Sequence, residues 1–179
     1  MIRPPCGATL AAEMTILPIV PYPDPRLNSA ATPVTTFDTA LATLAADLLE
    51  TMRAAPGIGI TAPHVGIGLR LVVIALPADG QVRTYVNPHI EWASPETARF
   101  EEGSVSMPGV SADIDRPARV RVRYQDLTGA ARVEDADGML AVCLQHEIDQ
   151  LDGLFWTRRL SRLKRERVVR RFEKLRRAA

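Results

Sequence analysis

With 179 residues, the chain is long enough for one domain with a substantial core, and a second independently folding domain is not expected. Hydrophobic residues make up 46% and charged residues 24%, a globular balance that excludes a disordered or fibrous chain. No run of about 18 apolar residues exists, so we expect no membrane span. The two cysteines, Cys6 and Cys143, have no disulfide spacing pattern, which favours a cytoplasmic protein.

The first thirteen residues show no periodicity and contain two prolines and a glycine, so we expect a disordered extension over 1–13 and a single domain over 14–179. Met14 is an alternative start to Met1. Five prolines between residues 16 and 33 then favour extended chain over the surface.

Apolar spacing predicts three helices. The first begins at Asp38 and ends before Pro56, and the second covers 139–151. The third has an apolar stripe between residues 160 and 175 on an otherwise basic surface. Strands are expected at three places, 70–76, 82–86 and 119–124. Because strands and helices do not alternate regularly, the predicted class is α+β.

The net charge of +1 conceals an asymmetry along the chain. Residues 157–179 contain eleven Lys and Arg against two Glu, a net +9, which leaves residues 1–156 with 11 basic and 19 acidic side chains, a net −8. A basic tail on an acidic body indicates an anionic partner, and nucleic acid is the first candidate.

The segment Gln145-His-Glu-Ile-Asp-Gln-Leu151 is the most informative for chemistry. On a helix, His146 and Gln150 share one face and Glu147 lies beside them. With His in place of Gln150 this would be H-E-x-x-H, in which two imidazoles hold a metal and the Glu acts on its bound water. Here the pattern is H-E-x-x-Q, and a single His on an apolar helix is more often a hydrogen-bonded core residue than a ligand.

Three motifs, in order, resemble those of the peptide deformylase family. Residues 57–64 read G-I-G-I-T-A-P-H, residues 102–106 read E-G-S-V-S and residues 145–151 read Q-H-E-I-D-Q-L. The family reads G-hydrophobic-G-hydrophobic-A-A-P-Q, E-G-C-L-S and Q-H-E-hydrophobic-D-H-L. Landmarks such as Met107-Pro-Gly109 extend the resemblance from about Ile16 to the C-terminus. It implies small antiparallel or mixed sheets around a central H-E-x-x-Q helix, with a basic helix at the C-terminus.

The resemblance also implies an activity. Members of the family remove the formyl group from the N-terminal methionine of new bacterial or organellar proteins, so formyl-methionyl peptides are the implied ligands. They use iron, zinc or a similar divalent metal, held by the Cys of the second motif and both His of the third. Ribosomal RNA is then the expected partner of the basic region 157–179.

Carried over by position, His146 matches the first imidazole ligand and Glu147 the general acid and base. Ser104 stands at the metal-binding cysteine and Gln150 at the second histidine. A neutral hydroxyl and a neutral amide are weak donors compared with a thiolate and an imidazole. We therefore expect iron or zinc to bind weakly or not at all.

The positions that hold the formyl oxygen are also altered. The glutamine of the first motif is His64, and the first of the two alanines before it is Thr61. Gly59 allows the backbone to approach a ligand closely. The backbone N–H of Val105 can still contribute to an oxyanion hole.

These replacements predict a deformylase relative that hydrolyses weakly or not at all and binds N-terminal peptides or the ribosome. The alternative is an active, divergent enzyme in which His64 joins His146 as a ligand, with Glu147 or Ser104 completing the site. Two other possibilities are a thiolate supplied by Cys143 and a Ser104 nucleophile with a histidine base.

Overall fold

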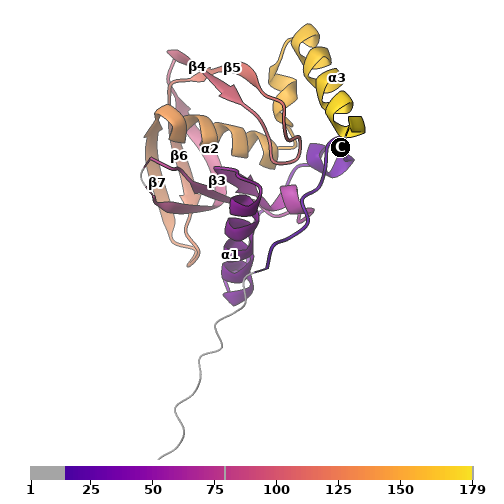
Figure 1. Cartoon of the computed structure of the whole chain (residues 1–179). Helices are drawn as coiled ribbons and strands as arrows, with labels where there is room; N and C mark the ends of the chain where they lie inside the picture. The colour runs from indigo at the N-terminus through magenta and orange to yellow at the C-terminus, as the bar shows by residue number, and fades with distance from the viewer. Residues whose placement is uncertain (1–14, 79, 179) are drawn as a thin grey trace, which may run out of the picture.

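The computed structural model describes residues 15–78 and 80–178 (Figure 1). The predicted extension over 1–13 and the alternative start at Met14 lie outside these residues, and the single domain over 14–179 stays a prediction. In chain order the elements are η1 (Pro25–Asn28), α1 (Thr39–Ala54), β1 (Gly59–Thr61), η2 (Ala62–Val65), β2 (Leu71–Ala75), β3 (Val82–Ala93), β4 (Thr97–Glu102), β5 (Ala112–Pro117), β6 (Arg119–Gln125), β7 (Ala131–Asp137), α2 (Gly138–Leu151), η3 (Trp156–Arg159) and α3 (Arg162–Ala178).

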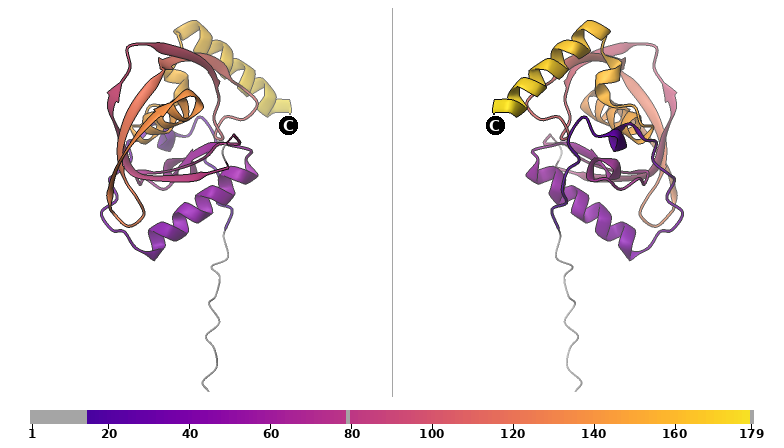
Figure 2. Two further views of the ribbon diagram at one scale, coloured as in Figure 1. Left: turned by 90° about the vertical axis from the view of Figure 1, so that its left-hand side faces the viewer. Right: turned by 90° about the vertical axis from the view of Figure 1, so that its right-hand side faces the viewer.

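Two antiparallel sheets surround one central helix. The larger has five strands in the order β1-β2-β3-β6-β7, and β4 pairs with β5 in a separate two-stranded sheet. Helix α2 contacts strands of both sheets, and the strands curve around it in Figure 2. The α+β prediction, with small antiparallel sheets around the H-E-x-x-Q helix, is confirmed.

Helix α2 agrees with the predicted span of 139–151. The turn that follows its C-terminal end passes very close to the backbone of η1. Leu144, Ile148 and Leu151 pack on the five-stranded sheet in the main core. The turn after the helix has Gly153 at φ +75°, where a Cβ would lie 2.8 Å from the carbonyl oxygen of Asn28. Only glycine fits this close approach, so the chain can leave α2 and pass directly beside η1.

Helix α1 forms where the sequence predicts it. The side chain of Asp38 accepts a hydrogen bond from the backbone N–H of Leu41 at 3.0 Å, which caps the first turn. Leu41, Leu48 and Met52 are buried in the cluster that includes residues of β1 and β2. This packing holds the segment Gly57–Gly59 next to α2.

Helix α3 docks through a narrower apolar face than predicted. Val168 and Phe172 are buried, and the ring of Phe172 lies 6.1 Å from that of Tyr22. Leu163 and Leu175, two residues of the predicted apolar stripe between residues 160 and 175, are 57% and 44% exposed and lie outside the docked face. No helix of the described residues is long and apolar enough to cross a bilayer.

Candidate active-site cleft

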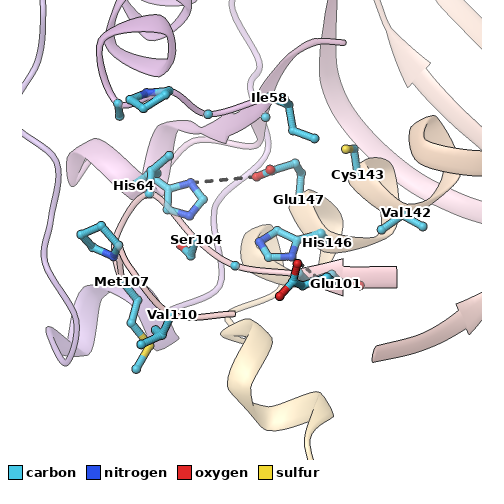
Figure 3. A pocket seen from close by; sticks show the side chains of 18 of the residues that line it. Ile58, His64, Glu101, Ser104, Met107, Val110, Val142, Cys143, His146 and Glu147 are labelled. Atoms are coloured by element: carbon cyan, nitrogen blue, oxygen red, sulfur yellow. Dashed lines mark hydrogen bonds and ion pairs between the residues drawn. The ribbon is translucent and has the colours of Figure 1, made fainter. Parts of the chain in front are cut away.

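A cleft of about 510 Å³ lies between α2, the β1–η2 segment and the loop that follows β4 (Figure 3). Six of the seven predicted site residues line it, namely Gly59, His64, Ser104, Val105, His146 and Glu147. The seventh, Gln150, is not among the lining residues. The motifs thus meet in one place although they are separated by up to 90 residues of sequence.

Gln150 is held by a contact with a distant segment of the chain. Its side chain is buried, and the amide Nε2 donates a hydrogen bond to the backbone carbonyl of Leu27 at 2.8 Å. A buried amide requires such a partner, and here it belongs to η1. Through this bond the amide joins α2 to η1, and the expectation that Gln150 and His146 point at one spot stays a prediction.

His146 is oriented by a buried chain of charges. Its Nδ1 lies 2.8 Å from Glu102 Oε2, and Arg116 donates two hydrogen bonds to the same carboxylate at 2.5 and 2.9 Å. Burial disfavours protonation of His146, but the bond to Glu102 and the charge of Glu147 outweigh it, so the pKa of His146 is raised. Nδ1–H therefore donates to Glu102, and Nε2 is the ring nitrogen left for the cleft.

Glu147 is packed tightly against the β1 backbone. A Cβ on Gly59 would lie 2.4 Å from Glu147 Oε1, so any larger residue would displace the carboxylate. Burial raises the pKa of Glu147 to about 7. Its other oxygen, Oε2, has no hydrogen-bond partner among the described residues and lies 3.9 Å from His64 Nδ1.

Glu147→Gln tests this burial through the pH dependence of folding. Because the pKa rises from 4.5 to about 7 on folding, the folded chain retains a proton that the unfolded chain loses in that interval. The retained proton on Glu147 contributes to stability fully below about pH 4.5, and this contribution is lost as the pH rises through 7. We expect the variant to match the parent near pH 4.5 and to exceed it at pH 8, by on the order of 3 kcal/mol. Urea unfolding at both pH values measures the free energy of unfolding of the variant and of the parent. The same difference between them at pH 4.5 and at pH 8 would contradict the expectation.

His64 lies opposite Glu147 on η2 and is 1% exposed. The backbone N–H of Thr61 donates to His64 Nδ1 at 3.0 Å, and Thr61 Oγ1 lies 2.9 Å from the same nitrogen. Burial, together with the charge of His146, lowers the pKa of His64 to about 3, so the ring is neutral. Sequence reasoning noted Thr61 only as a departure from the family pattern and missed this contact.

Two chemical alternatives receive no support from the geometry. Ser104 Oγ accepts a hydrogen bond from the backbone N–H of Ser106 at 3.2 Å, and among the described residues it bonds to neither histidine of the cleft. Burial, with the charge of Glu147, raises the pKa of Cys143 to about 12, so without a metal ion that thiol stays protonated. Neither a serine nucleophile nor a thiolate ligand is therefore in place.

The described part of the chain contains no group of three or more His, Cys, Asp or Glu arranged to hold a metal ion.

The sequence profile of the polypeptide deformylase family matches residues 16–166. The chain belongs to the peptide deformylase family. The Gly-rich segment, the E-G-x-x-S loop and the H-E helix converge on one cleft.

Relatives and solved structures agree with this assignment. The peptide deformylase-like protein of Brucella melitensis is 62% identical over 164 residues, which cover 92% of this chain and all of that protein. The peptide deformylase of Phenylobacterium zucineum is 44% identical over 93% of this chain and all of that protein. The crystal structure of a peptide deformylase from Legionella pneumophila has a TM-score of 0.87 at 39% identity, covering 92% of this chain and 97% of that one. The peptide deformylase of Ehrlichia chaffeensis, solved in complex with actinonin, has a TM-score of 0.85 at 36% identity over 90% and 98% of the two chains.

Proposed function

We propose that this chain is a deformylase-family protein that binds the formyl-methionyl N-terminus of peptides and hydrolyses them slowly or not at all. The observation that carries the proposal is the set of donor atoms beside His146. The family reaction depends on a divalent metal, which lowers the pKa of bound water from 15.7 to about 7. Of the three ligand positions of the family, only His146 keeps an imidazole, whereas the Ser104 hydroxyl is bonded to Ser106 and the Gln150 amide is bonded to Leu27. These donors do not fit a divalent iron or zinc ion.

The cleft itself retains features that suit an N-formyl-methionyl group. Much of its wall is apolar, with Met107, Val110 and Val142 among the lining side chains, and would accept a methionine side chain. Two buried polar atoms that line it lack partners among the described residues, His64 Nε2 and Glu147 Oε2. A formamide offers one acceptor oxygen and one donor N–H, which can satisfy both.

The relatives support a role apart from the housekeeping reaction. Rhizobium meliloti strain 1021 has a peptide deformylase-like protein 58% identical over 92% of this chain, and also a peptide deformylase 43% identical over 90% of it. The coexistence of both proteins in one strain fits a binding function for the type more similar to this chain.

Metal content, turnover and binding can be measured on one preparation. We expect protein purified without oxygen to hold far less than one equivalent of metal, to release no formate above background and to bind formyl-Met-Ala-Ser. Unformylated Met-Ala-Ser and formyl-Gly-Ala-Ser should bind more weakly. Stoichiometric metal, with turnover abolished by Glu147→Gln, would overturn the proposal and favour the active enzyme in which His64 joins His146.

We also propose that α3 contacts ribosomal RNA, which places the protein in the cytoplasm. The helix buries Val168 and Phe172, while most of its Lys and Arg face outward. Glu166 pairs with Arg162 and Arg170 within the helix. Co-sedimentation with ribosomes should weaken steeply between about 50 and 200 mM salt, as expected when cations contact phosphates. Lys174→Glu with Arg177→Glu should abolish it, and salt-independent binding would contradict the proposal.

A further inference from the structure

Two departures from the family's first motif are in direct contact. Where the family has alanine and glutamine, this chain has Thr61 and His64. Thr61 Oγ1 and the Thr61 backbone nitrogen lie 2.9 and 3.0 Å from His64 Nδ1. Both residues are buried, with relative exposures of 0% and 1%. The exchange at position 64 is therefore accompanied by a new polar partner at position 61.

The contact fixes which ring nitrogen carries the proton. A backbone N–H can only donate, so the Nδ1 that accepts from Thr61 carries no hydrogen. In a neutral imidazole the proton must then be on Nε2. The low pKa of His64 agrees, because protonation would require Nδ1 to give up this bond.

Nε2 is the atom that faces a ligand. It is buried, has no hydrogen-bond partner in the described part of the chain, and belongs to a residue that lines the cleft. We infer that Thr61 is a positioning residue that holds His64 with Nε2–H directed into the cleft, as the donor for a carbonyl oxygen of the bound peptide. This inference rests on the proposed peptide-binding function. It adds that the group recognised by His64 is a hydrogen-bond acceptor.

The opposite tautomer would reverse that polarity. Glu147 Oε2 lies 3.9 Å from His64 Nδ1 and would attract a proton on that nitrogen. Nε2 would then present a lone pair to the cleft and repel a carbonyl oxygen. The backbone N–H of Thr61 opposes this state, and the hydroxyl adds a second contact that resists rotation of the ring. A glutamine amide carries its own donor and has no tautomers, so it does not need the hydroxyl contact.

Nitrogen NMR of histidine-labelled protein without ligand tests the tautomer directly. We expect His64 to show an unprotonated Nδ1 and a protonated Nε2 throughout the neutral pH range. Thr61→Ala keeps the backbone N–H but loses the contact that resists rotation of the ring, so the same resonances should broaden, and Thr61→Ser should restore them. A protonated Nδ1 in the parent would overturn the inference, whether or not any peptide binds.

A double-mutant cycle tests the consequence for binding. Thr61→Ala should weaken formyl-Met-Ala-Ser binding by about three- to tenfold, the range expected for one lost hydrogen bond, and Thr61→Ser should recover it. In the His64→Gln background, Thr61→Ala should have no effect, because the amide donates without help. An equal loss in both backgrounds would mean that Thr61 only supports the fold and would overturn the inference. A parent that binds no formyl peptide but shows the expected tautomer would refute the proposed function alone.

Discussion

Replacing Ser104 by Cys and Gln150 by His should produce a chain that retains about one equivalent of iron or zinc and releases formate from formyl-methionyl peptides. The partners that orient both imidazoles are already in place. His146 donates to Glu102, and the carbonyl of Leu27 accepts from residue 150 at 2.8 Å. A metal-binding histidine almost always donates its other N–H to a carboxylate or a backbone carbonyl. A histidine at position 150 would therefore find its acceptor at Leu27.

The size of the effect follows from the number of ligands. A complete ligand set binds zinc with an apparent free energy of about 10 to 16 kcal/mol, whereas either single replacement leaves the set incomplete. We expect each single variant to hold far less than one equivalent of metal. Turnover in the double variant should rise by several orders of magnitude, because bound metal lowers the pKa of water from about 15.7 to about 7.

Elemental analysis and formate release measure the two outcomes. Adding Glu147→Gln to the double variant should remove turnover but leave the metal in place, which separates binding from catalysis. If the folded double variant holds no more metal than Ser104→Cys alone, then a histidine at position 150 that is bonded to Leu27 does not present its other nitrogen to the cleft, and the explanation by missing ligands is wrong.

The predictable parts of the fold are those with local, periodic signals. Helices α1 and α2 were predicted within about a residue because apolar spacing, the cap at Asp38 and the glycine at 153 agree with one another. Six of the residues named from the motifs line one cleft because each motif is a short, continuous segment and the fold brings the three segments together.

Strands β4, β5 and β7 were not predicted because charges replace apolar alternation in them. Arg99 pairs with Asp115 across β4 and β5, and Arg121 with Asp135 across β6 and β7. Such cross-strand ion pairs stabilise a sheet without leaving a period of two in hydrophobicity. Strand β3 also continues past Pro88 to Ala93, because the register shift between Val86 and His89 accommodates the proline.

The spacing of residues in the sequence could not predict the hydrogen-bond partners of the polar side chains. The amide of Gln150 could be placed on the same helical face as His146, but its partner, Leu27, lies 123 residues away in sequence. The contact between Thr61 and His64 is local, yet it depends on the turn into η2. Arg116 carried no signal at all, since it comes from an unpredicted strand and reaches its partners across 14 and 33 residues.

Arg116→Ala should lower the free energy of unfolding by about 3 to 5 kcal/mol, the range for breaking a buried ion pair by removing one partner. Arg116 is 3% exposed and donates to Glu102 and, at 2.8 Å, to Asp149. Burial favours the neutral form of Glu102, but its bonds to Arg116 and His146 prevail and lower its pKa to about 2. Without the arginine, two carboxylates remain buried with only part of their compensation.

Arg121→Ala is the control, because Arg121 makes the same two-bond contact with one carboxylate at the surface, without a second carboxylate such as Asp149. Arg121 donates through Nε and Nη2 to Asp135 at 2.7 and 2.9 Å, as Arg116 does to Glu102, but the two side chains are 49% and 66% exposed. An exposed pair of this kind contributes about 0 to 1 kcal/mol. Urea unfolding near pH 7 should therefore separate the two variants by at least about 2 kcal/mol. Equal losses would mean that Glu102 and Asp149 find other partners, and the orientation of His146 could then not depend on this buried arginine.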